Sequence, residues 1–149
     1  MTKPAPVKPL RPRAAATLSM LRGQGPGTKV MMGKRHADHK FMPNKFVFPG
    51  GRVDFADCRH QPASDLHPKV AQKLMTKTRG RPSPGRARGL AMAAVRETFE
   101  ETGLVIGEAS TASSISRAQA WREFAATGYR PRLDGLRYFA RAVTPPGRP

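Results

Sequence analysis

The chain has 149 residues, 38% of them hydrophobic, which is enough to bury one core and too few for two domains. Its 27 Lys and Arg against 10 Asp and Glu give a formal net charge of +17, which favours phosphate-bearing ligands and nonspecific nucleic-acid binding, while an aromatic content of only 7% argues against a dedicated nucleic-acid reader. The single cysteine excludes an internal disulfide and no apolar run is long enough to cross a membrane, so we expect a cytoplasmic protein without a membrane partner, its oligomeric state left open.

The first half of the chain predicts an extended arm followed by short strands. Residues 1–13 alternate proline with basic residues, which disfavours a helix and favours a disordered, solvated arm. Two apolar runs, 15–21 and 29–35, flank the turn-forming segment GQGPG, so we expect them to pair as antiparallel strands. Residues 46–48 predict a buried strand that ends at a sharp Pro-Gly-Gly turn over 49–51.

The middle of the chain predicts two helices separated by a loop. Pro68 suits the first turn of a short helix that extends through Met75. The segment 79–86, RGRPSPGR, is interpreted as a mobile basic loop. The segment 89–103 is dense in helix formers, and its final residue, Gly103, stands where a helix would end in the left-handed conformation.

The last third predicts alternating strands and helix. Residues 104–107 suggest a brief strand, and Ser116 with Gln119 resembles a capping box that opens a helix to about residue 126. Residues 136–143 form the last strand candidate, and no structure is expected beyond them.

Three carboxylates share one face of the 89–103 helix. With Glu97 as the origin, Glu101 falls at about +40° and Glu100 at about −60°, for roughly 100° per residue. Crowded oxygen ligands of this kind suit Mg²⁺ or Mn²⁺, although a solvated acidic face is the ordinary alternative. The roughly opposite side carries an apolar stripe that we expect to bury against a sheet, composed of Ala91, Met92, Val95, Phe99 and Thr102.

The segment RETFEETGL at residues 96–104 resembles the second half of the Nudix box, GX5EX7REUXEEXGU, where U is a bulky aliphatic residue. Thr98 is the one departure within it. Upstream, FVFPGG resembles the strand and glycine turn of that family, and Asp57 stands where the first Glu of the box is expected. Residues 58–95 separate Asp57 from Arg96 in place of the motif's X7, which indicates an insertion at about 58–88.

The resemblance implies an α/β fold over residues 14–149: a Nudix-type α/β/α sandwich around a mixed β-sheet, incomplete at the C-terminus. It implies hydrolysis, dependent on Mg²⁺ or Mn²⁺, of the pyrophosphate bond in a nucleoside diphosphate linked to another moiety. CoA or acyl-CoA is favoured as this small-molecule substrate, because the insertion looks like that of a bacterial subgroup related to the acyl-CoA diphosphatase-like branch.

The resemblance also implies roles by position. The three glutamates would act in catalysis, and Arg96 would hold a catalytic carboxylate in place. The metal ligands would be Gly51 (through its backbone carbonyl), Asp57, Glu97, Glu100 and Glu101.

Other residues carry weaker expectations. Substrate could be contacted by Lys34, Arg35 and Gly50, although a cation in so basic a chain is more often merely solvated. We expect Trp121 in the core, and surface positions for the histidines, His36, His39, His60 and His67.

Two other functions stay open at this point. One is a non-catalytic protein that binds RNA or nucleotides on a degenerate Nudix fold, which the net charge and the altered box would suit. The other is removal of pyrophosphate from the 5′ end of RNA.

Overall fold

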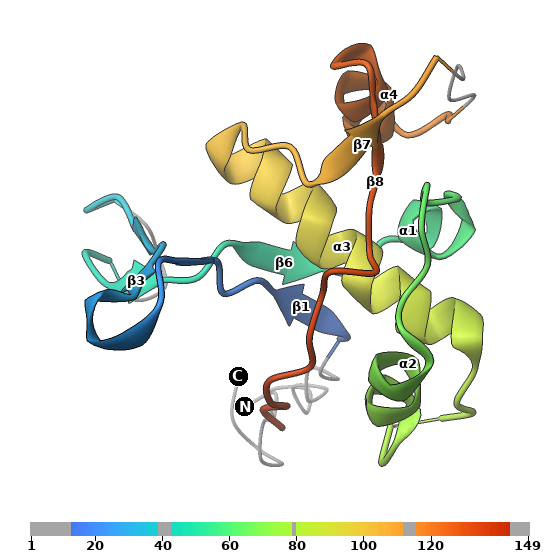
Figure 1. Cartoon of the computed structure of the whole chain (residues 1–149), viewed down its shortest axis with the longest axis horizontal. Helices are drawn as coiled ribbons and strands as arrows, with labels where there is room; N and C mark the ends of the chain where they lie inside the picture. Colours follow the sequence, from blue (N-terminus) through green and yellow to red (C-terminus); the bar gives the residue numbers. More distant parts are fainter. Residues whose placement is uncertain (1–12, 39–42, 79, 112–115, 144–149) are drawn as a thin grey trace, which may run out of the picture.

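The long helix α3 (Pro84–Thr102) lies at the centre of the molecule, with short strands and smaller helices around it (Figure 1). The computed structural model describes residues 13–38, 43–78, 80–111 and 116–143. Three of the expectations fall outside these residues. They concern the arm, of which only Arg13 is described, the surface position of His39, and the end of the chain at 144–149. No helix in the described part of the chain is both long and apolar enough to span a membrane.

Within residues 13–143, as far as the structure describes them, the strands are two or three residues long and pair two by two. The four antiparallel pairs are β1 (Ala15–Thr17) with β6 (Gly50–Arg52), β2 (Leu21–Arg22) with β3 (Lys29–Val30), β4 (Gly33–Lys34) with β5 (Phe46–Val47), and β7 (Gly107–Ala109) with β8 (Tyr129–Pro131). Each apolar run expected as one strand therefore divides in two. Only the inner parts, β2 and β3, pair with each other, while β1 joins β6 against α3.

The α/β class expected from the sequence is confirmed, whereas a continuous mixed sheet is not found among the described residues. The one parallel contact there is an isolated bridge between Ser64 and Arg132. The segment 136–143 was expected as a strand and forms none. It is tied instead through a side chain, because the guanidinium of Arg141 donates to the backbone carbonyls of Leu74, at 2.7 Å, and Thr76.

Helix α3 begins within the segment expected to be a mobile loop. The side-chain oxygen of Ser83 accepts a hydrogen bond from the backbone N–H of Arg86 at 3.2 Å, and Pro84 occupies the first turn, so the helix starts at Pro84. It ends as expected at Gly103, whose φ of 73° is left-handed.

The smaller helices differ in how well the sequence anticipates them. Helix α2 (Pro68–Met75) has the expected bounds. Helix α4 (Gln119–Ala126) forms without the expected capping box, because the side chain of Ser116 accepts instead from the backbone of Ala118. The helix α1 (Phe55–Arg59) was not anticipated.

Three further strand predictions are corrected. The strand expected to be buried at 46–48 forms as β5, but Phe46 and Phe48 are exposed, because β5 pairs only with β4 and lies outside the core. The strand expected at 104–107 begins only at Gly107 and pairs with the unanticipated β8. The expected turn at Gly50 and Gly51 is part of β6, where Gly50 takes a φ of 153° opposite Thr17.

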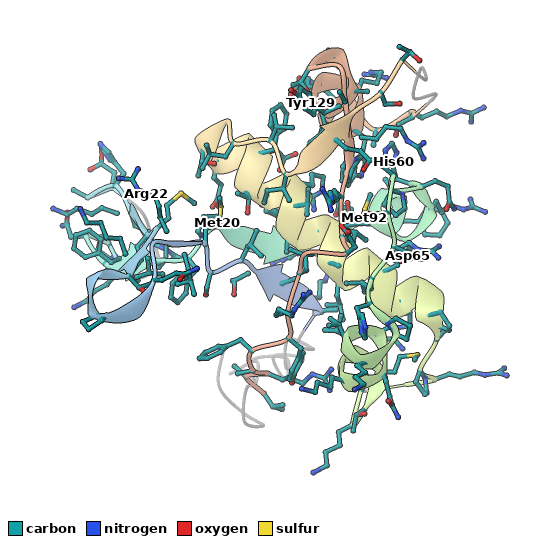
Figure 2. All side chains as sticks on the ribbon, viewed as in Figure 1. Met20, Arg22, His60, Asp65, Met92 and Tyr129 are labelled. Carbon is teal, nitrogen blue, oxygen red and sulfur yellow. The ribbon has the colours of Figure 1, made fainter. Side chains whose placement is uncertain are left out.

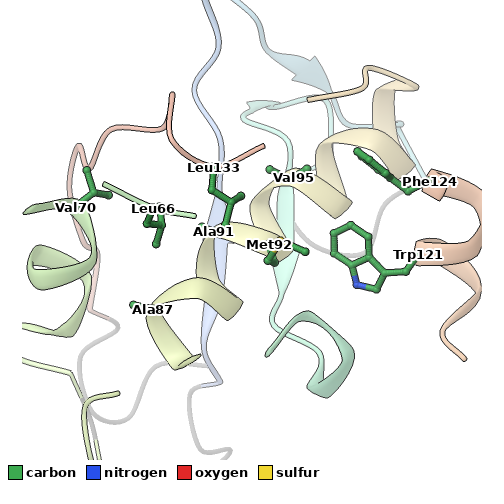
Figure 3. Close-up of a cluster of buried hydrophobic side chains, with 9 residues drawn as sticks. All are labelled: Leu66, Val70, Ala87, Ala91, Met92, Val95, Trp121, Phe124 and Leu133. Carbon is green, nitrogen blue, oxygen red and sulfur yellow. The ribbon is translucent and has the colours of Figure 1, made fainter. Parts of the chain in front are cut away.

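The buried core lies along one side of α3 and is built chiefly by helices (Figure 3). The expected apolar stripe is confirmed at its centre, where Met92 and Val95 are fully buried and Ala91 nearly so, while Thr102 is exposed. No described residue of β1 or β6 belongs to this cluster, so the side chains that cover the stripe come from helices and loops rather than from a sheet. Its buried members are Leu66, Val70, Ala87, Ala91, Met92, Val95, Trp121, Phe124 and Leu133.

Candidate functional site

Arg96 lies buried at the centre of a cluster of charged side chains between α1 and α3. Its Nε and Nη2 donate to the carboxylate of Asp57 at 2.8 and 3.0 Å, and Nη2 also donates to the backbone carbonyl of Arg52 at 2.9 Å. Its Nη1 donates to Glu97 at 3.0 Å and to Glu100 at 2.9 Å. Burial tends to lower the pKa of Arg96, but the Asp57 hydrogen bonds and the neighbouring carboxylate charges outweigh it and raise the pKa. Arg96 is therefore a permanent cation that orients three carboxylates.

Asp57 is fully enclosed by its partners. Its Oδ1 accepts from the indole N–H of Trp121 at 3.0 Å as well as from Arg96. Its Oδ2 accepts from the backbone N–H of Asp54 at 2.8 Å and from Arg96. With an exposed fraction of 0%, Asp57 has both oxygens engaged inside the protein. The expected metal ligand thus lies behind the solvent-facing carboxylates, in contact with the arginine.

Close packing of α1 on α3 keeps Asp57 beside Arg96 despite the residues inserted between them. Gly89 of α3 leaves room for the thiol of Cys58, since a β-carbon at position 89 would come within 2.4 Å of the sulfur. Burial is the main reason why the pKa of Cys58 is raised, and the charge of Asp57 adds to it against that of Arg86. The thiol is therefore a packing group rather than an activated nucleophile.

The three glutamates of α3 divide between two partners. Glu97 and Glu100 share the Nη1 of Arg96, and the side chain of Glu97 is only 17% exposed. Glu101 instead accepts a hydrogen bond from the backbone N–H of Gly50 on β6 at 3.2 Å. Burial raises the pKa of Glu100, opposed by Arg96 and reinforced by the charge of Glu97. This crowding of negative charge is what a divalent cation would relieve.

Two glycines of β6 allow the strand to approach its neighbours closely. A β-carbon on Gly51 would lie 2.4 Å from both the carboxyl carbon and Oε1 of Glu97, so this backbone lies directly against that carboxylate. A β-carbon on Gly50 would lie 2.3 Å from the carbonyl oxygen of Ala16. Gly50 therefore lets β6 lie close to the backbone of β1, and Gly51 leaves room for the carboxylate of Glu97 beside the pair β1–β6.

The available donor groups are all oxygens, which suits Mg²⁺ or Mn²⁺. Glu97 Oε2 and Glu100 Oε1 accept no hydrogen bond from another described residue and could meet a cation. Among the described residues, no three acidic, imidazole or thiol groups already converge as a preassembled metal site. The residues therefore suit a divalent cation because their donors are oxygens and because Gly51 leaves space beside the carboxylate of Glu97.

The candidate substrate residues lie in two places. Gly50 contacts Glu101 and so adjoins the acidic face. Lys34, which is exposed on β4, and the adjoining Arg35 belong to the β4–β5 pair instead, where the backbone N–H of Arg35 donates to Lys45 at 3.0 Å. Of the predicted substrate residues, Gly50 thus lies beside the acidic face, whereas Lys34 and Arg35 belong to a different strand pair.

His60 and Trp121 join the site from positions that gave no such indication. The half-buried ring of His60 stacks on the indole of Trp121, with centroids 4.4 Å apart and planes inclined by 6°. Figure 2 shows His60 on the α1 side of α3. Burial lowers the pKa of His60 and the charge of Arg130 lowers it further, against Asp57. The expected surface position of His60 is wrong, and its spacing from Trp121 carries no signal of this contact.

The fold is similar to that of a solved Nudix hydrolase. The crystal structure of a Nudix hydrolase from Alicyclobacillus acidocaldarius superposes with a TM-score of 0.64 at 25% sequence identity, over 92% of this chain and 64% of that one. The chain thus spans just under two thirds of the length of the solved protein. No family model matches the sequence, and no curated protein does.

Proposed function

We propose that the chain hydrolyses the pyrophosphate bond of a nucleoside diphosphate linked to another moiety, with Mg²⁺ or Mn²⁺ as cofactor. The observation that carries this proposal is the pairing of two carboxylates by one arginine. A single nitrogen of the Arg96 guanidinium binds both Glu97 and Glu100, whose side chains are partly exposed. The similarity to a Nudix hydrolase structure and the motif at 96–104 support the same reaction class.

The cation would be held by oxygen atoms of α3 and β6. Glu97 and Glu100 would supply their uncommitted oxygens, Glu101 would supply a further carboxylate, and Gly51 its backbone carbonyl. In this proposal Asp57 is a positioning residue for Arg96 instead of the ligand expected from the sequence, because both of its oxygens are already engaged.

The reaction adds water to one phosphorus while the bond from that phosphorus to the bridging oxygen breaks, and the leaving phosphate keeps the electron pair. The chemistry supplied by a bound Mg²⁺ is screening of the diphosphate charge and a lowered pKa of the attacking water. Glu97, the least exposed of the motif glutamates, would accept the proton that the water releases. Arg96 stays charged throughout and keeps that carboxylate oriented.

CoA or an acyl-CoA is the substrate that we favour, on the resemblance of the sequence alone. The net charge of +17 supports any substrate that carries several phosphates. Lys34 and Arg35 are candidates for outer phosphate contacts.

The test is product analysis with Mg²⁺ and a panel of CoA, ADP-ribose, NADH, dinucleoside polyphosphates and 5′-triphosphorylated RNA. We expect release of a mononucleotide from one class, and a strong loss of turnover in Glu100→Gln, because this variant lacks a carboxylate that would hold the cation. The matched control is Glu123→Gln, an exposed glutamate of α4 that hydrogen-bonds Gln119 and should retain full activity.

The result also separates the competing functions. Turnover confined to triphosphorylated RNA would replace CoA by RNA 5′ ends as the substrate. Absence of turnover in a folded chain that binds RNA with steep salt dependence would reject the hydrolase and support a binding protein, which the net charge also suits.

A further inference from the structure

We infer that Trp121 is a positioning residue for the acidic face of α3, and that it acts through the chain Trp121, Asp57, Arg96. The inference rests on the proposed function for its catalytic consequence, but its structural part can be tested without a substrate. Trp121 belongs to α4, outside the motif at 96–104, and the indole N–H bonds to Asp57 rather than to one of the motif glutamates.

The indole N–H is placed to fix one orientation of Asp57. It donates to Oδ1 at 3.0 Å, and the same oxygen accepts from Nε of Arg96 at 2.8 Å. Trp121 and Asp57 are both 0% exposed, so water does not replace this donor if it is lost. The carboxylate of Asp57 can therefore turn only at the cost of a buried hydrogen bond.

Neighbouring rings hold the indole itself in place. His60 stacks on one face at 4.4 Å, and the ring of Phe124 lies 5.6 Å away at 59°. These contacts keep the indole N–H directed at Asp57. Trp121 therefore orients a carboxylate in addition to filling the core. Arg96 in turn presents Nη1 to Glu97 and Glu100, so the position of α4 is transmitted to the carboxylates.

The test compares Trp121→Phe, which keeps an aromatic ring but removes the N–H, with Val70→Ala, which perturbs the same hydrophobic cluster from α2. The probe is Mn²⁺ binding to the full chain, measured by titration calorimetry. We expect affinity to fall roughly tenfold in Trp121→Phe, at the low end of losses for groups that orient metal ligands, and to change little in Val70→Ala. In an Asp57→Asn background, Trp121→Phe should add almost nothing.

Turnover gives a second discrimination. If Trp121 positions the catalytic carboxylates, Trp121→Phe should lower kcat with little change in KM. Equal losses of Mn²⁺ affinity in Trp121→Phe and Val70→Ala, or additive losses with Asp57→Asn, would show that Trp121 acts through core stability alone and overturn the inference.

A spectroscopic measurement keeps the inference distinct from the hydrolase proposal. The chain has one tryptophan, so a single indole N–H resonance reports this contact. In metal-free protein we expect Asp57→Asn and Arg96→Lys to shift that resonance and speed its hydrogen exchange, while Glu123→Gln leaves it unchanged. If the wild type binds no Mn²⁺ but these shifts occur, the proposed function fails and the positioning contact stands; an unmoved resonance rejects the contact.

Discussion

Arg96 and Asp57 are joined by two hydrogen bonds, of 2.8 and 3.0 Å, although residues 58–95 lie between them in the chain. The pair is asymmetric. Asp57 has no other cation within 4.0 Å among the described residues, whereas Arg96 also contacts Glu97 and Glu100. The arginine is therefore the charge on which the burial of Asp57 depends.

This asymmetry predicts unequal effects of removing the two partners. Arg96→Met leaves a buried aspartate without its cation and should cost about 3–5 kcal/mol of unfolding free energy. Asp57→Asn leaves Arg96 with its two glutamates and should cost about 1–3 kcal/mol. Urea unfolding followed by circular dichroism measures both, and a larger loss in Asp57→Asn would contradict the asymmetry.

The two glycines of β6 predict opposite outcomes of the same substitution. In Gly51→Ala the atoms nearest to the new methyl group belong to the carboxylate end of Glu97, which can swing aside, so the fold should persist while Mg²⁺-dependent activity falls. In Gly50→Ala the methyl group meets the backbone of Ala16 and Thr17, at 2.3 and 2.5 Å, at a φ of 153°. That variant should lose more than about 1 kcal/mol of stability.

Thermal unfolding and activity, measured on both alanine variants, separate the two effects. A stable Gly50→Ala, or an unstable Gly51→Ala, would show that the close approach of β6 to its neighbours is not as described.

His60 predicts a pH dependence of stability. Its pKa lies below the ordinary 6.5 in the folded chain, chiefly because the ring is half-buried. Between that lower value and 6.5 the unfolded chain binds more protons than the folded one, so the free energy of unfolding falls as the pH falls through this interval. His60→Phe, which can still stack on Trp121, should remove that part of the slope.

The measurement is urea unfolding of the wild type and His60→Phe at several values between about pH 5 and pH 7.5. Identical slopes in the two proteins would mean that His60 titrates alike when folded and unfolded, against the burial described for it.

Cys58 predicts slow thiol chemistry. Burial and the nearby charge of Asp57 raise its pKa, so less thiolate is present at a given pH than in an open chain. A disulfide reagent at mildly alkaline pH should therefore label the folded protein more slowly than the same protein in denaturing urea. Equal labelling rates in the folded and the denatured protein would contradict the burial and raised pKa described for Cys58.

The sequence predicts α3 and its two faces because a helix satisfies its backbone locally. Met92 and Val95 recur at helical spacing and are buried, and Gly103 marks the end of the helix. The beginning was missed although Ser83 before Pro84 is a recognised start signal, here hidden among basic loop residues. Of the site, the proximity of Glu97 and Glu100 could be predicted, since both lie on one helical face.

The remaining features depend on contacts between distant segments. Residues 136–143 have apolar positions that suited a strand, yet Phe139 is 93% exposed, because a strand also needs a backbone partner that no sequence pattern specifies. The contact between Trp121 and Asp57 joins α4 to α1, and no local periodicity relates those two helices. Tertiary packing determines both features, and local sequence propensity does not predict them.

The hydrogen bonds that define the acidic face join segments that are far apart in the sequence. They link Gly50 to Glu101, Asp57 to Arg96, and Asp57 to Trp121. Helix α3 can form from neighbours within a few residues, whereas these bonds require long loops to close first. During folding, helical signal should therefore arise before the carboxylates acquire their final arrangement. Competence to bind a cation is in this sense a late property of the chain, and its appearance marks the completion of tertiary structure.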